Sequence, residues 1–159
     1  MVSGGQTGVD RVALDFALAH ALPHDGWCPA GRRAEDGPLP PQYQLRETTS
    51  RRYDQRTRWN VRDSDGTVIF AGARPLQGGT RLTSEIAVKQ SKPLLILCRN
   101  ETSPGDAAER LARFVEGHAI VRLNVAGPRA SQADALELFV DDVLARWFRM
   151  LTSSDGLPD

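Results

Sequence analysis

Two glycine pairs stand immediately before stretches of helical periodicity and are well suited to bind an anion. The first lies in Ser3-Gly4-Gly5-Gln6-Thr7-Gly8 and the second in Gly78-Gly79-Thr80. Backbone N–H groups approach an anion closely only where no Cβ intervenes, and the dipole of a following helix favours negative charge by roughly 0.3 to 1 kcal/mol. The pattern therefore predicts a phosphate site. The ligands expected from these turns are Gly4, Gly5, Gln6, Thr7, Gly78, Gly79, Thr80 and Thr83.

A simpler interpretation is that these glycines only form tight turns. A third glycine, Gly127, precedes the last helical stretch, and in a parallel sheet all turns from strand to helix lie on the edge where such sheets bind ligands. Neither glycine pair has the G-x-G-x-x-G order of dinucleotide-binding folds, and no Gly-Lys-Ser/Thr follows. This disfavours an ordinary dehydrogenase or ATPase.

Charged residues near these turns are candidates for further contacts. A guanidinium beside a phosphate can add a bidentate contact, which makes Arg11, Arg32 and Arg129 auxiliary candidates. Arg32 and Glu35 lie in a glycine-bounded loop, which would contact the ligand, form a surface turn or contact another subunit. Glu85 is the best candidate for a catalytic acid, and the alternative is an ordinary glutamate on a helix surface.

The apolar pattern alternates between strands and helices. Strands are predicted at 67–71, 93–98 and 119–125, and helices at 9–22, after Gly79, from Ser103-Pro104 to Gly117, and from Ser131 and Asp134 onward. Thr7 is expected to cap the first helix, with Asp10 completing the cap. This alternation predicts an α/β fold, a Rossmann-like three-layer sandwich with a mostly parallel sheet.

Two parts of the chain are less well defined. Residues 26–65 hold eight arginines between Arg32 and Arg62, and we expect a short strand near 26–28, an extended loop and a helix around 51–59. Met1 and Val2 alone precede the first motif. The first strand is therefore expected to be unusually short, or the start to be internal to a longer natural chain.

The length and composition of the chain indicate its domain organisation and the partners that it is expected to lack. The 159 residues suit a single domain, with a ligand-binding domain at 1–150 and a flexible polar tail at 151–159. Lys and Arg together number 20, as do Asp and Glu, so no net field attracts nucleic acid. The two cysteines and three histidines lack the spacing of a zinc site, and we expect no protein-built metal site and a reducing cytoplasm. No apolar run approaches the roughly 20 residues that span a membrane.

Several longer runs together resemble one known family, the "putative molybdenum carrier" family, also described as the circularly permuted YpsA-like branch of the SLOG superfamily. The runs are residues 3–11, 26–37, 63–67, 78–80 and 124–129. The resemblance implies a Rossmann-like sheet, a homo-oligomer with a tetramer as the expected state, and a pocket between the two glycine pairs. The carrier name implies molybdenum cofactor, a pterin with a phosphate, and the superfamily implies nucleotide-derived ligands.

Three functions follow for comparison. The leading hypothesis is a cytoplasmic binding protein for a phosphorylated small molecule, without a required reaction. The rival is an N-glycosidase similar to the Lonely Guy phosphoribohydrolases, in which Glu85 would act on a nucleoside monophosphate; Glu85 has their spacing from Gly78, but Arg81 and Leu82 replace a glycine and a threonine of their motif. The third is a nucleotide sensor or scaffold whose charged segment 32–62 contacts other subunits.

Overall fold

A parallel sheet positions the predicted turns. The structure, a computed structural model, describes residues 1–132 and 135–154. The central strands run in the order β6 (Leu94–Cys98), β5 (Gly66–Ala71) and β7 (Leu123–Ala126), all parallel. Val2 extends this arrangement by parallel bridges to Asn124 on one side and Asp25 on the other. The glycine-bearing turns after Val2, β5 and β7 therefore leave the sheet in the same direction.

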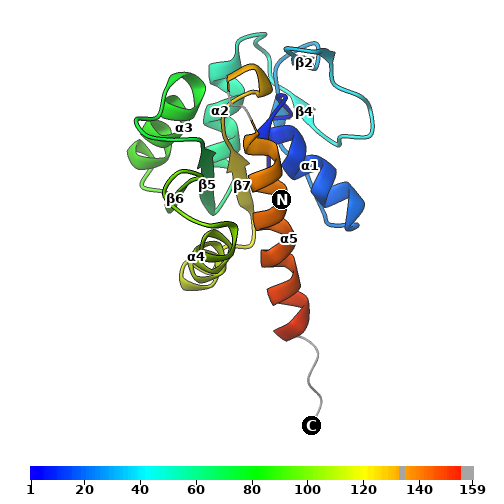
Figure 1. The fold of residues 1–159 in the computed structure, drawn as a ribbon. Coiled ribbons are helices and arrows are strands. Elements are labelled where there is room, and N and C mark those ends of the chain that lie inside the picture. The colour runs from blue at the N-terminus through cyan, green and yellow to red at the C-terminus, as the bar shows by residue number, and fades with distance from the viewer. Residues whose placement is uncertain (133–134, 155–159) are drawn as a thin grey trace.

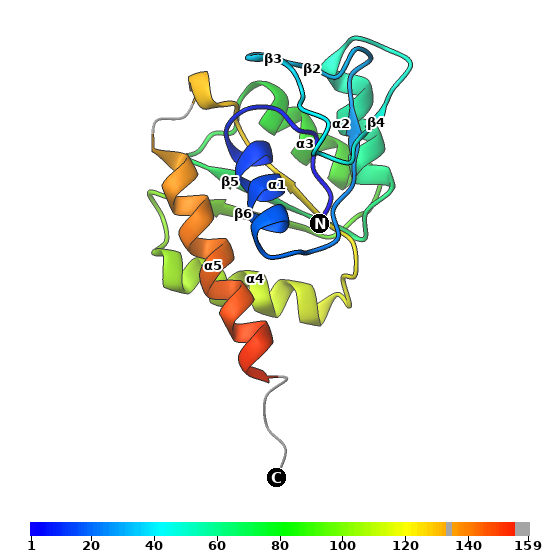
Figure 2. The ribbon, with the colours of Figure 1, turned by 90° about the vertical axis from the view of Figure 1, so that its right-hand side faces the viewer.

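Helices cover both faces of the sheet (Figures 1 and 2). One face carries α1 (Val9–Ala19), α4 (Pro104–Gly117) and α5 (Leu136–Ser154), whose apolar side chains form the main core with Val68 and Phe70 of β5. The other face carries α2 (Tyr53–Arg62) and α3 (Gly78–Lys89). β5 is buried along its whole length, as a strand covered on both faces must be. The predicted Rossmann-like α/β sandwich is confirmed.

The segment with least sequence pattern folds against the first helix. β1 (Trp27–Cys28) pairs in parallel with β4 (Arg46–Glu47), and β2 (Arg33–Ala34) pairs antiparallel with β3 (Gly37–Pro38). Residues between β1 and β4, among them Leu39 and Tyr43, pack with Leu14 of α1 in a separate small hydrophobic cluster. The short strand expected near 26–28 is confirmed, and the helix expected at 51–59 begins and ends slightly later, as α2.

The ends of several helices correct the sequence prediction. Ser103 caps α4 as expected, accepting a hydrogen bond from the N–H of Asp106 at 3.2 Å. The prediction that Thr7 caps α1 is wrong, because Gly8 occupies that position and the Thr7 hydroxyl bonds to Glu35 instead. The last strand begins at Leu123 rather than at 119. A 3₁₀ turn, η1 (Ala130–Gln132), precedes α5.

The carboxyl end of the chain also differs from expectation. α5 begins at Leu136, and Asp134, expected to open it, lies outside the described residues. Residues 151–154 continue this helix, so the described part of the predicted tail is helical; the remaining residues of that tail also lie outside the described part. Across residues 1–132 and 135–154, no helix has the length and apolarity needed to cross a membrane.

Hydrogen bonds to Trp27 fix α2 against the small parallel pair. The Asn60 side chain accepts from the Trp27 N–H at 2.7 Å and donates to its carbonyl at 3.0 Å. Asp63, at the end of α2, accepts from the indole N–H of Trp27 at 2.7 Å and from Arg62 at 2.6 Å. The Arg62 bond, with help from Trp27, lowers the pKa of Asp63 to about 2.

Because the pKa of Asp63 is low in the folded protein, we expect the free energy of unfolding to fall in acid. A pKa lowered in the folded state means that Asp63 stabilises the protein above the unfolded value near 3.8 and that this contribution is lost as pH falls toward 2. We expect Asp63→Asn to lower the free energy of unfolding by about 1 kcal/mol at pH 7, after allowing for solvent screening, and by less at pH 3. Urea denaturation at both pH values measures this difference.

The matched control is Asp142→Asn, which breaks an exposed ion pair with Arg146 on α5. It should change stability by less than about 0.5 kcal/mol at either pH. An equal loss for Asp63→Asn at pH 7 and pH 3 would show that the indole hydrogen bond, not the charge, is what matters.

Candidate binding pocket

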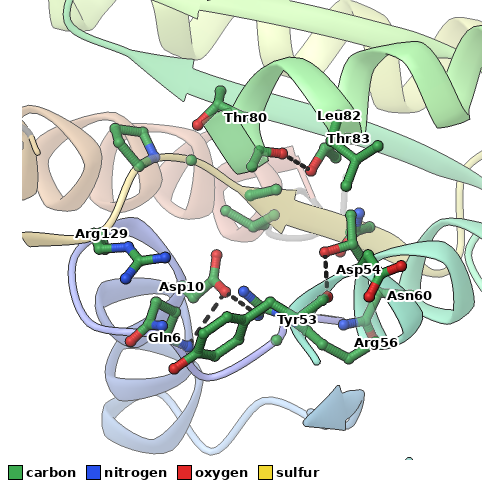
Figure 3. Close-up of a pocket in the computed structure, with 18 of the residues that line it drawn as sticks. Gln6, Asp10, Tyr53, Asp54, Arg56, Asn60, Thr80, Leu82, Thr83 and Arg129 are labelled. Carbon is green, nitrogen blue, oxygen red and sulfur yellow. Dashed lines mark hydrogen bonds and ion pairs between the residues drawn. The ribbon is translucent and has the colours of Figure 1, made fainter. Parts of the chain in front are cut away.

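A pocket lies where the turns after Val2 and β7 meet α2 and the start of α3. It encloses about 630 Å³ of empty volume, part of it open to solvent. Its walls are residues 4, 6 and 10, α2 residues between 53 and 60, α3 residues between 79 and 83, and residues 124–129 with Gln132. We call it the glycine pocket. Figure 3 shows Thr80 and Thr83 of α3 across the pocket from Gln6, Asp10 and Arg129.

The first glycine pair is required by packing. A Cβ at Gly4 would lie 1.6 Å from Nη1 of Arg56, so this guanidinium rests directly on the Gly4 backbone. Gly5 has a φ of 77°, and a Cβ there would come within 2.7 Å of Leu39. For Gly4 and Gly5 the fold itself is therefore a sufficient reason for glycine, as the simpler interpretation held.

A buried ion pair forms the floor of the pocket. Nη1 of Arg56 lies 2.8 Å from Oδ2 of Asp10, with side-chain exposures of 13% and 6%. The same carboxylate oxygen accepts from the Gln6 N–H at 3.3 Å. Burial raises the pKa of Asp10, and the neighbouring Arg56 opposes that rise. The pair joins α1 to α2 and leaves little of either charge for a ligand to neutralise.

Two donors beside this ion pair lack partners. Nε2 of Gln6 and Nε of Arg56 are buried, and neither has a hydrogen-bond partner within the described part of the chain. Gln6 is only 5% exposed, and its Oε1 already accepts from the N–H groups of Thr7 and Glu35. A buried donor without a partner costs about 1 to 3 kcal/mol. Two such donors at one pocket wall favour a ligand that carries an acceptor.

The second glycine pair has no packing reason of its own. Gly79 has an ordinary helical backbone, and among residues 1–132 and 135–154 a Cβ there would meet nothing within 4 Å outside the backbone of its own helix. The same is true of the space around Gly78, although its φ of 51° favours glycine. Gln77 precedes α3 and provides no side-chain cap, so the first N–H groups of α3 keep their capacity to donate. An anion can reach these N–H groups over a surface that Gly79 leaves open.

Arg129 supplies a cation at the third turn. Its guanidinium lies 5.4 Å from the centre of the Tyr53 ring and 3.9 Å from Glu35. Gly127, two residues earlier, is required by packing, because a Cβ there would lie 2.7 Å from the carbonyl oxygen of Phe70. The residues with unpartnered buried donors, the first turn of α3 and Arg129 therefore line one space. This combination suits an anionic group with several acceptor oxygens.

Comparison with known proteins places the chain. A model described as the Circularly permutated YpsA SLOG family matches residues 1–148. The chain belongs to this family. It is also similar to a solved structure, the "Putative molybdenum carrier protein" of Syntrophus aciditrophicus SB, with 43% identity over 92% of each chain and a TM-score of 0.90. Among curated proteins, no relative matches the sequence. The resemblance seen in the sequence runs is confirmed.

The SLOG fold of this chain brings part of the predicted set together. Of the expected ligands, those that line the glycine pocket are Gly4, Gln6, Gly79, Thr80, Thr83 and Arg129. Thr83 donates to the Gly79 carbonyl at 2.8 Å and so holds the first turn of α3. These residues come from three separate turns, as the sequence predicted for strands that end at one edge of a sheet.

Other predicted ligands are engaged elsewhere. Arg11 binds Asp36 through two nitrogens, each at 3.1 Å, and also approaches the Gly5 carbonyl. Arg32 donates to four backbone carbonyls of the loop between 39 and 45, which stabilises that loop. Neither guanidinium lines the glycine pocket. Their contact with ligand stays a prediction without support from the geometry.

Glu35 joins three segments of the SLOG domain beside the pocket. It accepts from the hydroxyl groups of Thr7 and Ser131, the latter at 2.7 Å, and from the Ser131 N–H at 3.3 Å. These hydroxyl bonds, that of Thr7 foremost, lower the pKa of Glu35. Glu35 and Thr7 therefore position the first and third turns against each other, a structural role that sequence spacing did not reveal.

Glu85 does not reach the glycine pocket. It is 59% exposed on α3 and pairs with Arg81, 69% exposed, at 3.2 Å. This is the ordinary arrangement of a glutamate on a helix surface, one turn from its partner. The described residues also contain no group of three or more His, Cys, Asp or Glu side chains that could hold a metal ion.

Sequence reasoning missed Tyr53 and Arg56 as pocket residues. The signal for them was spacing, since Tyr53, Arg56, Thr57 and Asn60 recur at intervals of three and four along α2 and so share one helix face. Apolar periodicity does not reveal that face, because its members are polar.

Proposed function

We propose that this protein binds a phosphorylated small molecule in the glycine pocket and acts as a carrier or binding protein. The observation that carries the proposal is Gly79, a helical glycine without a packing requirement among the described residues, which lines the same pocket as Gln6, whose buried Nε2 has no partner there. A phosphate there would accept from the first N–H groups of α3 and from Arg129.

Molybdenum cofactor is our first candidate ligand. The similar protein from Syntrophus aciditrophicus carries the molybdenum carrier name, and a phosphorylated pterin has the anionic group that the pocket suits. In this proposal Gln6, Gly79, Thr80 and Arg129 hold the phosphate end. A nucleotide-like ligand is the alternative, because it presents the same phosphate chemistry. No reaction is required for either.

The proposal is tested by ligand retention and by binding. Protein purified under native conditions is denatured, and the released small molecules are identified by mass spectrometry. Thermal shifts are then measured with molybdenum cofactor, AMP and ADP-ribose. We expect a phosphorylated compound to be retained or to raise the melting temperature. Absence of both results for all these compounds would overturn the proposal.

Arg129→Gln gives the residue-level prediction. Removing a charge-assisted hydrogen bond costs roughly 1.5 to 3 kcal/mol, so the affinity measured by calorimetry should fall at least about tenfold for whichever of the three compounds shifts the melting temperature. Arg81→Gln, which removes an exposed arginine of α3 outside the pocket, is the control and should leave the affinity unchanged. Equal effects of the two substitutions would point to nonspecific charge attraction.

The assembly also stays a prediction. The expected homo-oligomer, with a tetramer as the expected state, is checked by light scattering during size-exclusion chromatography. We further propose a cytoplasmic location and no nucleic-acid partner, in keeping with the balanced charge of the sequence.

A further inference from the structure

A second hollow adjoins the glycine pocket at the start of α3. It is formed by the loop of residues 73–78, which follows β5, and it encloses about 1000 Å³ of empty volume that is open to solvent. Thr80, Pro128 and Gln132 line both spaces. We call this second space the outer hollow. The two spaces therefore share walls, and the first turn of α3 stands at their common border.

The first turn of α3 borders both spaces, and this position bears on how many substituents the phosphate of the ligand carries. A phosphate monoester has one substituent, so with its phosphate on the N–H groups of α3 it would fill only one of the two spaces. A phosphodiester or diphosphate bridge has a substituent on each side. Gln6, 5% exposed, lines the glycine pocket, and its Nε2 has no hydrogen-bond partner within the described residues, an observation that is independent of the helix start.

We infer that the ligand is a two-part molecule joined by a phosphodiester or diphosphate bridge, with the bridge at the start of α3 and one substituent in each space. This inference rests on the proposed function and specifies its ligand class. The bridge accepts from the N–H groups of α3, and Gly79 leaves room for it to pass from one space to the other.

The lining of the outer hollow indicates the chemistry of the second substituent. Pro75, Leu76 and Pro128 provide apolar surface, and the amides of Gln77 and Gln132 provide hydrogen-bonding groups. The arginine of this loop, Arg74, pairs with Glu101 at 3.4 Å, a closer ion pair than that of Arg129 with Glu35 at 3.9 Å. An uncharged ring or sugar fits this combination better than a second phosphate does.

The test compares AMP, a monoester, with ADP-ribose, which carries a second substituent beyond a diphosphate bridge. Affinities are measured by isothermal titration calorimetry on the full chain. We expect ADP-ribose to bind at least about tenfold more tightly, because a further sugar gains contacts in the outer hollow. Ala73→Trp fills that hollow from an exposed position. It should reduce the ADP-ribose affinity to that of AMP and leave AMP unchanged.

Val88→Trp is the matched control, since Val88 is 67% exposed on α3 and lies outside both spaces. It should change neither affinity. Equal affinities of AMP and ADP-ribose, or an unchanged ADP-ribose affinity in Ala73→Trp, would overturn the two-part ligand and leave the proposed function standing. If AMP binds no better than adenosine and ADP-ribose does not bind, the phosphate site is contradicted, and the two-part ligand falls with it.

Discussion

Asp10→Ala should lower the free energy of unfolding by about 3 to 5 kcal/mol, a large part of the 5 to 15 kcal/mol typical of a domain. The substitution leaves the Arg56 guanidinium buried against Gly4 without its counter-ion and removes the acceptor of the Gln6 N–H. An uncompensated buried charge is among the most destabilising changes a core can receive. Urea denaturation followed by circular dichroism measures the loss.

Asp36→Ala is the matched control for this prediction. Asp36 also binds an arginine, Arg11, with two contacts of 3.1 Å, but its side chain is 50% exposed. Because solvent screens an exposed pair, this substitution should cost about 1 kcal/mol or less. If Asp10→Ala and Asp36→Ala lowered the free energy of unfolding by similar amounts, burial would not explain the effect of Asp10→Ala.

A double substitution distinguishes the attraction between Asp10 and Arg56 from the cost of removing each charge from water. Burial raises the pKa of Asp10 even beside Arg56, which indicates that the attraction does not fully offset the removal of these charges from water. Asp10→Leu combined with Arg56→Met should therefore be more stable than either single substitution. The double-mutant cycle then gives the coupling between the two side chains. Additive losses would show that each residue acts through other contacts.

Local pattern was sufficient to predict the layers of this fold. The run Leu94–Cys98 and the strand before Gly72 are short and apolar, and the Ser103 cap with Pro104 marks the start of α4 from neighbouring residues alone. Such signals need no knowledge of distant contacts. The α/β alternation follows from them, and the common edge of the glycine turns follows from the alternation.

The contacts that shape the pocket are distant in sequence. Asp10 and Arg56 are 46 positions apart, and nothing in the first helical turn indicates that a residue of α2 will bind this acid. Thr7 is of a residue type that caps helices, but the cap position of α1 is Gly8, and Glu35, 28 positions later, accepts from the Thr7 hydroxyl. In both cases a tertiary partner overrides a local preference, and one sequence alone does not reveal that partner.

The two glycine pairs also show that similar sequence motifs can have different structural roles. They look alike in the sequence, yet Gly4 and Gly5 are enclosed by Arg56 and Leu39, whereas Gly79 faces open space. The sequence suggested one role for both pairs. The structure separates a pair that the fold needs from a glycine that it does not need, and only the second kind points to a ligand.

Gly79→Ala should therefore make the protein more stable and its binding weaker. Alanine is favoured over glycine inside a helix by about 0.5 to 1 kcal/mol, and within 4 Å the new Cβ meets no atom of the described residues beyond its neighbours and the backbone of its own helix. That methyl group would occupy the surface over which the anion approaches the N–H groups of α3. Losing one hydrogen bond to a charged group corresponds to a reduction in affinity of roughly 10- to 100-fold.

Gly105→Ala is the control, because Gly105 is the second residue of α4 as Gly79 is of α3, and the contact found for a Cβ there within the described part of the chain is Ser103 Oγ, at 3.9 Å. Both substitutions should raise the melting temperature, and calorimetry with AMP should detect weaker binding for Gly79→Ala alone. Unchanged AMP affinity in Gly79→Ala would remove the main support for an anion at α3. Lower stability would mean that the open space is filled by the chain itself in solution. An increase in stability together with a loss of binding is the result that only a ligand at this helix start explains.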